Sequence, residues 1–240
     1  MNGPSIEEII DIAYRREETV WRFAVDEAAA IDAHWHKLVA KNPSLFNGRV
    51  LLMHGSLVRE HAHGRVLEGS CFEAEYKAFL AWRDFGFPDR GVRNCFAMPA
   101  LRSIDGAFIL GEMAPSTASP GRIYFPAGTP EPADIRADLV DLEGNVLREL
   151  AEETGIGRSD VALAPGWTIV AEGPRLACMK IAQSPLSAAA IVDRIADFLA
   201  KEAAPELTRV VPVFSPDDFD MEHMPAFMLA YMRHAFDAGR

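Results

Sequence analysis

The amino-acid sequence predicts an α+β fold in which helices cover one mixed sheet. Apolar, β-branched segments typical of strands lie on both sides of a single acidic helix, which is predicted over residues 138–156. Strands that precede and follow one helix are typical of a mixed sheet packed against that helix. With 240 residues, 49% of them hydrophobic, the chain is long enough for a large core domain with a substantial extension.

The first 90 residues predict an extension made of helices and a β-hairpin. Residues 5–23 are expected to be helical, because Ser5 and Glu8 have the spacing of a capping box at a helix start. The other elements expected here are a helix, two hairpin strands and an amphipathic helix, in that order, over residues 25–42, 46–60, 64–72 and 72–86.

The remainder, residues 91–240, predicts the main domain. Turn signals at Asp105-Gly106 and Gly173-Pro174 indicate two strand pairs, and Gly155 is expected to end the acidic helix. The expected elements are a strand pair, a strand, a loop, the acidic helix, a strand pair, a helix, a strand and a C-terminal helix, over residues 92–115, 119–128, 129–138, 138–156, 167–186, 187–204, 208–214 and 223–236. We therefore place the domain boundary at residue 90.

Charge and composition narrow the possible partners. The formal net charge of −11 disfavours binding to nucleic acid, which requires Lys and Arg to neutralise phosphates. No segment approaches the ~20 apolar residues of a membrane span, and the N-terminus lacks the pattern of a secretion signal. Cys71, Cys95 and Cys178 are widely spaced and odd in number, which favours free thiols and a cytoplasmic location. The oligomeric state stays open.

Three glutamates crowd the end of the acidic helix. At ~100° per residue, Glu149, Glu152 and Glu153 lie on one helix face, while Leu150 points to the other side. Acidic runs are usually solvated faces, but these acids lie in the last turns, where the helix dipole disfavours anions. A divalent cation would offset their repulsion, and Mg²⁺ prefers carboxylate oxygens, water and phosphates. A metal site is therefore the alternative to a solvated face.

The segment RELAEETGI, residues 148–156, resembles the second half of the Nudix box, whose pattern is G-x5-E-x7-R-E-U-x-E-E-x-G-U with U apolar. The resemblance implies a Nudix α/β/α sandwich with the N-terminal extension packed on it. It also implies a hydrolase that cleaves diphosphates with Mg²⁺, or with Mn²⁺. By position, Glu149, Glu152 and Glu153 would be metal ligands, and Arg148 would orient a carboxylate through an ion pair.

The first half of the chain's box departs from the pattern. Val140 stands where the family has a glutamate that supports the arginine and the metal cluster, and Asp134 stands where it has glycine. The expected equivalent of that glycine is Gly128 in FPAGTPEP, which makes the intervening loop six residues longer. Asp141 and Glu143 are the two candidates to replace the missing glutamate.

Further candidates for the site carry ordinary alternative explanations. Glu172 and Glu206 are candidates for the general base, although each is also explained as a surface acid. Arg175 and Lys180 are candidates for contacting phosphate or sugar, but solvated charges at a strand edge explain them equally well. Tyr76 is a candidate for stacking on a base, whereas aromatic residues at helical spacing are more often core.

The substrate is expected to be a nucleotide-linked small molecule. The order of the segments over residues 33–230, with NPSLFNG, the helix around Tyr76 and FPAGTPEP, resembles the Nudix subgroup that cleaves UDP-glucose and UDP-galactose to UMP and sugar 1-phosphate. A UDP-sugar is therefore the first expectation. The alternatives are ADP-ribose, NAD(H), coenzyme A, a dinucleoside polyphosphate, or a non-catalytic Nudix-fold module that binds a nucleotide.

Overall fold

The computed structural model describes residues 3–43, 45–117 and 119–238, so Ser44 of NPSLFNG lies outside the described residues. The strands are β1 (Ser5–Ile9), β2 (Asp11–Arg16), β3 (Arg49–His61), β4 (Gly64–Glu75), β5 (Val92–Arg102), β6 (Phe108–Met113), β7 (Ile123–Tyr124), β8 (Ile135–Arg136), β9 (Leu139–Val140), β10 (Ala162–Leu163), β11 (Trp167–Glu172), β12 (Arg175–Gln183) and β13 (Leu207–Val213). The helices are α1 (Arg22–Asp26), α2 (Ala28–Lys41), α3 (Tyr76–Asp84), α4 (Leu142–Thr154), α5 (Ala188–Leu199) and α6 (Ala226–Ala238), and the short 3₁₀ helices are η1 (Pro132–Asp134), η2 (Arg158–Asp160) and η3 (Pro216–Asp218).

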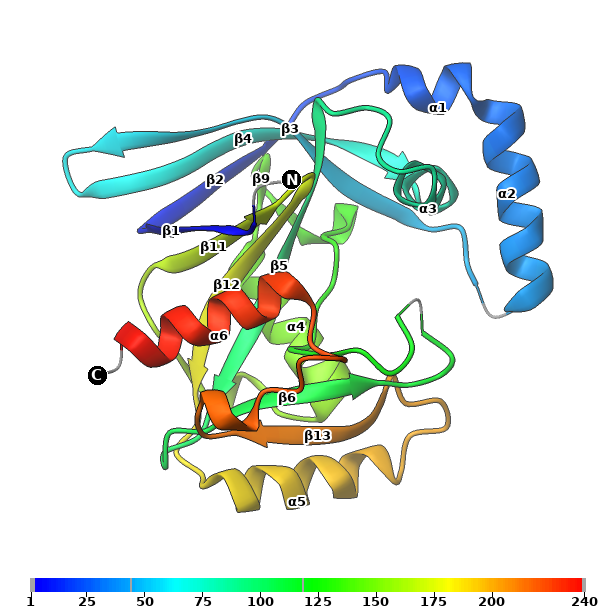
Figure 1. The fold of residues 1–240 in the computed structure, drawn as a ribbon. Helices are drawn as coiled ribbons and strands as arrows, with labels where there is room; N and C mark the ends of the chain where they lie inside the picture. Colours follow the sequence, from blue (N-terminus) through cyan, green and yellow to red (C-terminus); the bar gives the residue numbers. More distant parts are fainter. Residues whose placement is uncertain (1–2, 44, 118, 239–240) are drawn as a thin grey trace.

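One mixed sheet runs through both halves of the chain (Figure 1). Along its main path the strand order is β1-β11-β12-β5-β3-β4-β2-β9-β8, and β6, β7, β10 and β13 pair beside this path. β12 pairs with β5 in parallel and β2 pairs with β4 in parallel, whereas β11 with β12 and β3 with β4 are antiparallel. The predicted α+β class with a mixed sheet and covering helices is confirmed.

The helix predicted over residues 5–23 is wrong. This segment forms β1 and β2 and then enters α1 at Arg22. Ile12 and Tyr14 alternate into the core along β2, and Ile9 lies opposite Trp167 of β11. The backbone hydrogen bonds of this segment are therefore made to strands that are distant in sequence, which a local capping pattern cannot reveal.

The strands of the first 90 residues pair directly with strands of the remainder. β1 lies antiparallel to β11, and β3 meets β5 through the pairs Met53–Arg93 and His54–Val92. The boundary at residue 90 therefore falls between strands of one continuous sheet. Whether the two parts behave as separate domains stays a prediction.

Most of the other predicted elements are present with shifted ends. The hairpin formed by β3 and β4 is confirmed, and helix α3 begins at Tyr76 because β4 continues through Phe72 to Glu75. The strand expected over residues 119–128 reduces to the two residues of β7. In the part of the chain that the structure describes, no helix is long and apolar enough to span a membrane.

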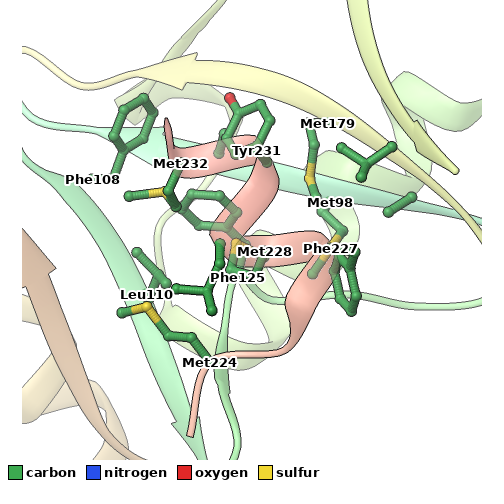
Figure 2. Packing of buried hydrophobic residues seen from close by; sticks show 14 of the residues in the cluster. Met98, Phe108, Leu110, Phe125, Met179, Met224, Phe227, Met228, Tyr231 and Met232 are labelled. Atoms are coloured by element: carbon green, nitrogen blue, oxygen red, sulfur yellow. The ribbon is translucent and has the colours of Figure 1, made fainter. Parts of the chain in front are cut away.

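A methionine-rich core fixes the central strands under helix α6 (Figure 2). Met228 and Met232 of α6 pack with Met98 of β5, Met179 of β12 and Phe125, and all five side chains are buried. Burying a side chain of this size contributes about 1.5–3 kcal/mol. The cluster thus holds β5 and β12, and the loop after Phe125, in a fixed relation to one another.

Candidate functional site

Helix α4 carries the acidic residues and is fixed at both ends. The Asp141 carboxylate caps its start by accepting a hydrogen bond from the backbone N–H of Gly144 at 2.8 Å. Gly155 ends the helix in the left-handed region, with a φ of 69°, as predicted. Val146 and Leu150 are fully buried, so the face of α4 that carries Glu149 and Glu153 has a fixed orientation.

Glu153 is buried against the backbone of the loop between β7 and η1. Glu153 is only 4% exposed. The Oε1 atom accepts a hydrogen bond from the backbone N–H of Ala127 at 3.0 Å, and the Oε2 atom has no hydrogen-bond partner among the described residues. A buried carboxylate oxygen without a partner is unfavourable and leaves one position for a further ligand.

Glu149 lies directly on Gly128 of the same loop. A Cβ atom added at residue 128 would lie 2.0 Å from the Oε1 atom and 2.3 Å from the Cδ atom of Glu149. The side chain of Glu149 is 12% exposed, and its Oε1 atom lies 2.8 Å from the Nη1 atom of Arg148. Glycine at residue 128 therefore permits the carboxylate to occupy this position.

Burial and mutual repulsion make these two carboxylates hard to ionise. Burial raises the pKa of Glu153 to about 8, and the negative charges of Glu206, Glu149 and Glu152 raise it further against the opposing Ala127 N–H. Burial likewise raises the pKa of Glu149 to about 7, although the neighbouring Arg148 opposes the shift. A bound cation would remove this penalty because it favours the charged forms.

Glu152 has a different environment. Its side chain is 60% exposed, and its Oε2 atom lies 3.1 Å from the Nη1 atom of Arg148 in an i,i+4 ion pair. Unlike Glu149, it does not line the adjoining cleft. The three glutamates predicted to share one face thus comprise one buried, one largely buried and one exposed carboxylate.

Arg148 is held by an aspartate that the sequence did not single out. The Nη2 atom of Arg148 donates to the Oδ2 atom of Asp134 at 3.1 Å, and Asp134 is 6% exposed. The same Oδ2 atom accepts from the Asn145 side chain and from the backbone N–H of Glu131, both at 3.0 Å. Asp134 therefore fixes the arginine that contacts Glu149.

Neither residue that we considered as a replacement for the missing glutamate contacts Arg148. Asp141 is occupied in capping helix α4, and Glu143 lies 2.5 Å from the Nζ atom of Lys180. The structure thus assigns the arginine-supporting position to Asp134, where the family pattern has glycine. The longer loop makes this possible because η1 turns its last residue toward helix α4.

A cleft of about 920 Å³ adjoins the buried carboxylates. Six of the residues predicted from the sequence line it, namely Tyr76, Gly128, Glu149, Glu172, Arg175 and Glu206. The cleft is large enough for a nucleotide-sized ligand, since small-molecule sites usually measure about 300–1,000 Å³. It combines acids with aromatic side chains from several elements.

The two candidates for the general base differ in their surroundings. Glu206 is exposed, and its charge raises the pKa values of both Glu149 and Glu153. Glu172 lies 3.6 Å from Arg175 in an ion pair across the β11–β12 turn. Glu206 thus interacts electrostatically with Glu149 and Glu153, whereas Glu172 forms an ion pair with Arg175.

Lys180 does not reach the cleft. Its side chain is 3% exposed, and its Nζ atom lies over the Trp167 ring at 4.7 Å and donates to the carbonyl oxygen of Gly166. With Glu143 as its ion-pair partner, Lys180 ties strand β12 to the first turn of helix α4. The structure therefore gives Lys180 a packing role and removes it from the candidates for substrate contact.

The cleft also contains residues that the sequence did not suggest. Arg83 of α3, Arg122 and Tyr124 line it, and Asp134 lies behind it at Arg148. Burial raises the pKa of the Tyr124 hydroxyl to about 12, so it stays protonated. The helical spacing of Arg83 from Tyr76 and Phe79 was a usable signal, whereas Asp134 was visible in the sequence only as a departure from the glycine of the box pattern.

The carboxylates of Glu149 and Glu153 fit a divalent cation, although, in the part of the chain that the structure describes, they are not part of a preformed group of three metal-binding side chains. Among the described residues, no group of three or more His, Cys, Asp or Glu side chains is arranged to hold a metal ion. The unpartnered Oε2 atom of Glu153 and the raised pKa values of Glu149 and Glu153 nevertheless indicate carboxylates that a cation would stabilise. Carboxylate oxygens are the ligands that Mg²⁺ and Mn²⁺ prefer.

Comparison with known proteins gives likeness to solved structures only. No family model matches the chain, and no curated protein matches it. The chain is similar to a Nudix hydrolase from Nitrosomonas europaea, at 19% identity over 61% of this chain and 90% of that chain, with a TM-score of 0.42. It is also similar to the Nudix domain of Shewanella oneidensis NrtR complexed with ADP ribose, at 15% identity over 62% of this chain and 89% of that chain, with a TM-score of 0.43.

Proposed function

We propose that this protein is a divalent-metal-dependent hydrolase of the Nudix type that cleaves the diphosphate of a nucleoside-diphosphate-linked small molecule. The observation that carries the proposal is the pair Glu149 and Glu153. They lie one turn apart in helix α4 with raised pKa values, Glu153 buried and Glu149 largely buried, and Glu149 lines a cleft large enough for a nucleotide. The carboxylates of a solvated acidic face would stay in water, because burying a charged group without a partner is unfavourable.

Glu149, Glu152 and Glu153 are the proposed metal ligands, for Mg²⁺ or Mn²⁺. Such a cation neutralises the oxygens of a diphosphate and lowers the pKa of a bound water. Glu152 contacts Arg148 in the structure and would contribute from the solvent side. Arg148, held by Asp134, keeps Glu149 in place through an ion pair.

The remaining step is removal of a proton from the attacking water. We assign this role to Glu206, because its carboxylate lines the cleft with Glu149 and has no ion-pair partner among the described residues. Glu172 is held in an ion pair with Arg175 and is therefore the second candidate. The water attacks one phosphorus atom, and the other phosphate leaves with the group attached to it.

The substrate class follows from the size and lining of the cleft. Aromatic side chains and arginines line it beside the acids, which suits a molecule with an aromatic base, a sugar and a charged diphosphate. A UDP-sugar is the first candidate because of the sequence resemblance. ADP ribose is the second, since it has the same linkage and is the ligand of one similar solved structure.

The test is an assay of UDP-glucose, UDP-galactose, ADP-ribose, NADH, coenzyme A and a dinucleoside polyphosphate with Mg²⁺ or Mn²⁺, in which nucleoside monophosphate release is measured. We expect turnover of at least one nucleotide sugar and none after chelation with EDTA. If both Glu152→Gln and Glu153→Gln retain turnover, the assignment of these residues as metal ligands is wrong. If no substrate turns over with either metal while one of them binds tightly, the chain is a nucleotide-binding module instead.

A further inference from the structure

Helix α3, which belongs to the N-terminal half of the chain, forms one wall of the cleft. Tyr76, Phe79 and Arg83 are three and four positions apart, so they share one face of the helix, and all three line the cleft together with Glu149. Arg83 and Glu206 both act electrostatically on the Tyr76 hydroxyl, whose pKa is raised chiefly by burial. The cationic wall and the acid cluster therefore belong to one cavity.

Arg83 has hydrogen-bonding capacity to spare. Its Nε atom donates to the Oδ1 atom of Asp84 at 2.8 Å, while its two terminal nitrogens have no hydrogen-bond partner in the described ranges of the chain. The side chain is 29% exposed, so the guanidinium is partly shielded from water. A guanidinium with two free N–H edges is suited to bidentate contact with phosphate oxygens.

The turn that follows α3 contacts a second arginine of the same cleft, Arg175. Phe87 has a φ of 59°, a conformation that is a genuine outlier for a bulky side chain. Its backbone N–H donates to the carbonyl oxygen of Trp82, and its ring packs edge-on against the buried Trp82 ring at 4.8 Å. The guanidinium of Arg175 lies over the Phe87 ring, 5.3 Å from its centre.

Local strain of this kind costs about 1–3 kcal/mol and persists only where the surroundings enforce it. Here the enforced conformation places an aromatic ring under Arg175, and Arg175 lines the cleft. Helix α3 and its following turn thus supply one arginine directly and orient another from strand β12. Both cations line a cavity that Glu149 and Glu206 also line.

We propose that Arg83 and Arg175 form a phosphate-binding arm that recognises the substrate's diphosphate, and that the N-terminal half thereby sets the specificity of the site. The proposal rests on the proposed function, because it assumes a diphosphate in this cleft. A cation held by the proposed metal ligands would neutralise the oxygens at the acidic side, and the two arginines would bind the oxygens that remain. A substrate without a diphosphate would leave the terminal nitrogens of Arg83 without an acceptor among the described residues and Arg175 with Glu172 as its ion-pair partner.

The test measures binding of methylenediphosphonate, a diphosphate analogue that cannot be hydrolysed, by titration calorimetry with Mg²⁺ present. We expect Arg83→Ala to weaken binding about 10- to 100-fold, since hydrogen bonds between charged groups are lost. Arg83→Lys restores part of the affinity through its charge. Phe87→Leu keeps an apolar contact with Trp82 and weakens binding about 2- to 5-fold, the size of a lost cation–π contact.

The matched control is Arg90→Ala, which removes an exposed arginine six residues from α3 that does not line the cleft. It is expected to bind the analogue as the wild-type protein does. Equal affinity for Arg83→Ala and the wild type, an equal loss in Arg90→Ala, or no binding of the analogue by the wild type would each overturn the proposal.

Two further readouts separate this proposal from the proposed function. Mn²⁺ binding, followed by electron paramagnetic resonance, is expected to be unchanged in Arg83→Ala and weakened in Glu153→Gln. In turnover, Arg83→Ala is expected to raise KM more than it lowers kcat, because the contact already exists in the ground state. Loss of Mn²⁺ binding in Arg83→Ala would assign the residue to the metal site, whereas failure of the wild type to bind Mn²⁺ would refute the proposed function alone.

Discussion

At the scale of single residues, the two buried carboxylates of α4 are unfavourable unless a cation accompanies them. The pKa values of Glu149 and Glu153 are raised to about 7 and about 8 from a reference of 4.5. Each pKa unit corresponds to about 1.4 kcal/mol of difference between the charged and neutral forms. Arg148 supplies one positive charge, which it divides among Asp134, Glu149 and Glu152. Ionisation of both Glu149 and Glu153 is therefore unfavourable without a cation, and a bound metal ion would offset the repulsion between them.

Glu153→Gln is expected to abolish turnover while leaving the protein equally stable or more stable without metal. The amide oxygen can still accept the hydrogen bond from the Ala127 N–H, and removal of one negative charge relieves repulsion from Glu149 and Glu206. Activity and the thermal midpoint with EDTA are the measurements. A large fall in the midpoint would show that the charge of Glu153 is needed for folding.

Asp134→Ala is expected to lower stability by roughly 1–3 kcal/mol, because the Asn145 amide and one edge of Arg148 lose a buried acceptor. Activity is expected to fall as well, since Arg148 no longer holds Glu149 in one position. Urea unfolding and kcat measure the two effects. The control is Asp197→Ala, which removes an exposed aspartate of α5, and an equal loss there would argue against a specific role for Asp134.

At the scale of elements, the site is made by a loop and a helix that fit closely. The loop after β7 contributes the Ala127 N–H to Glu153 and the bare backbone of Gly128 to Glu149. Gly128 also bridges to Ala97 of β5, so the loop is held to the central sheet. This close approach explains the glycine: a side chain at that position would occupy the space of the carboxylate.

Gly128→Ala is therefore expected to displace the Glu149 carboxylate and to reduce kcat at least 10-fold while the fold is retained. The Cβ atom would lie 2.0 Å from Glu149 Oε1, too close for any contact. Circular dichroism and kcat are the measurements. Gly157→Ala is the matched control, because its Cβ would lie 3.6 Å from Asp160 and its φ of −92° suits any residue. Unchanged kcat in Gly128→Ala would mean that Glu149 is not required where the structure places it.

At the scale of the whole molecule, the two halves of the chain share both the sheet and the cleft. Strand β1 pairs with β11, and β3 pairs with β5, so the sheet is continuous across residue 90. The cleft takes Tyr76 and Arg83 from the first half and Glu149 and Glu206 from the second. The N-terminal part therefore contributes to the site as well as to the fold.

The stability of the whole metal-free protein is expected to fall as the pH rises. Glu149 and Glu153 have folded-state pKa values above the unfolded value, so the folded state binds more protons between them. The destabilisation is absent below about pH 4.5, accumulates between pH 4.5 and the folded-state pKa values of about 7 and about 8, and is complete above them. The thermal midpoint in EDTA should therefore decline from pH 5 to pH 8.5, by about 2–4 °C for each kcal/mol lost.

Mg²⁺ should reverse this decline, with a stabilisation that increases with pH as the metal displaces protons. In Glu153→Gln the dependence on pH should be shallower and the effect of Mg²⁺ smaller. The measurement is differential scanning fluorimetry across pH with EDTA or Mg²⁺. A midpoint that rises from pH 5 to pH 8.5 without metal would contradict the raised pKa values.

Local patterns in the sequence were enough to predict the helix that carries the acids, its end at Gly155, and the α+β class. These features depend on interactions within a few residues, which the local sequence shows: helix periodicity, a glycine at a left-handed position, and apolar, β-branched segments in the strands from β3 onward. The sequence also indicated Gly128, Glu149 and Glu206, which the structure brings to one cleft.

Other features depend on contacts between segments that are far apart in the sequence. Residues 5–16 became strands because β11 and β4 offered partners, and the nearer of these in sequence begins only at residue 64. Asp134 became the support of Arg148, and Lys180 turned inward to Glu143, because the fold of the loop and of β12 placed them there. Burial, and with it the raised pKa values of the acids, depends on what packs around a residue, and no spacing along the chain contains that information.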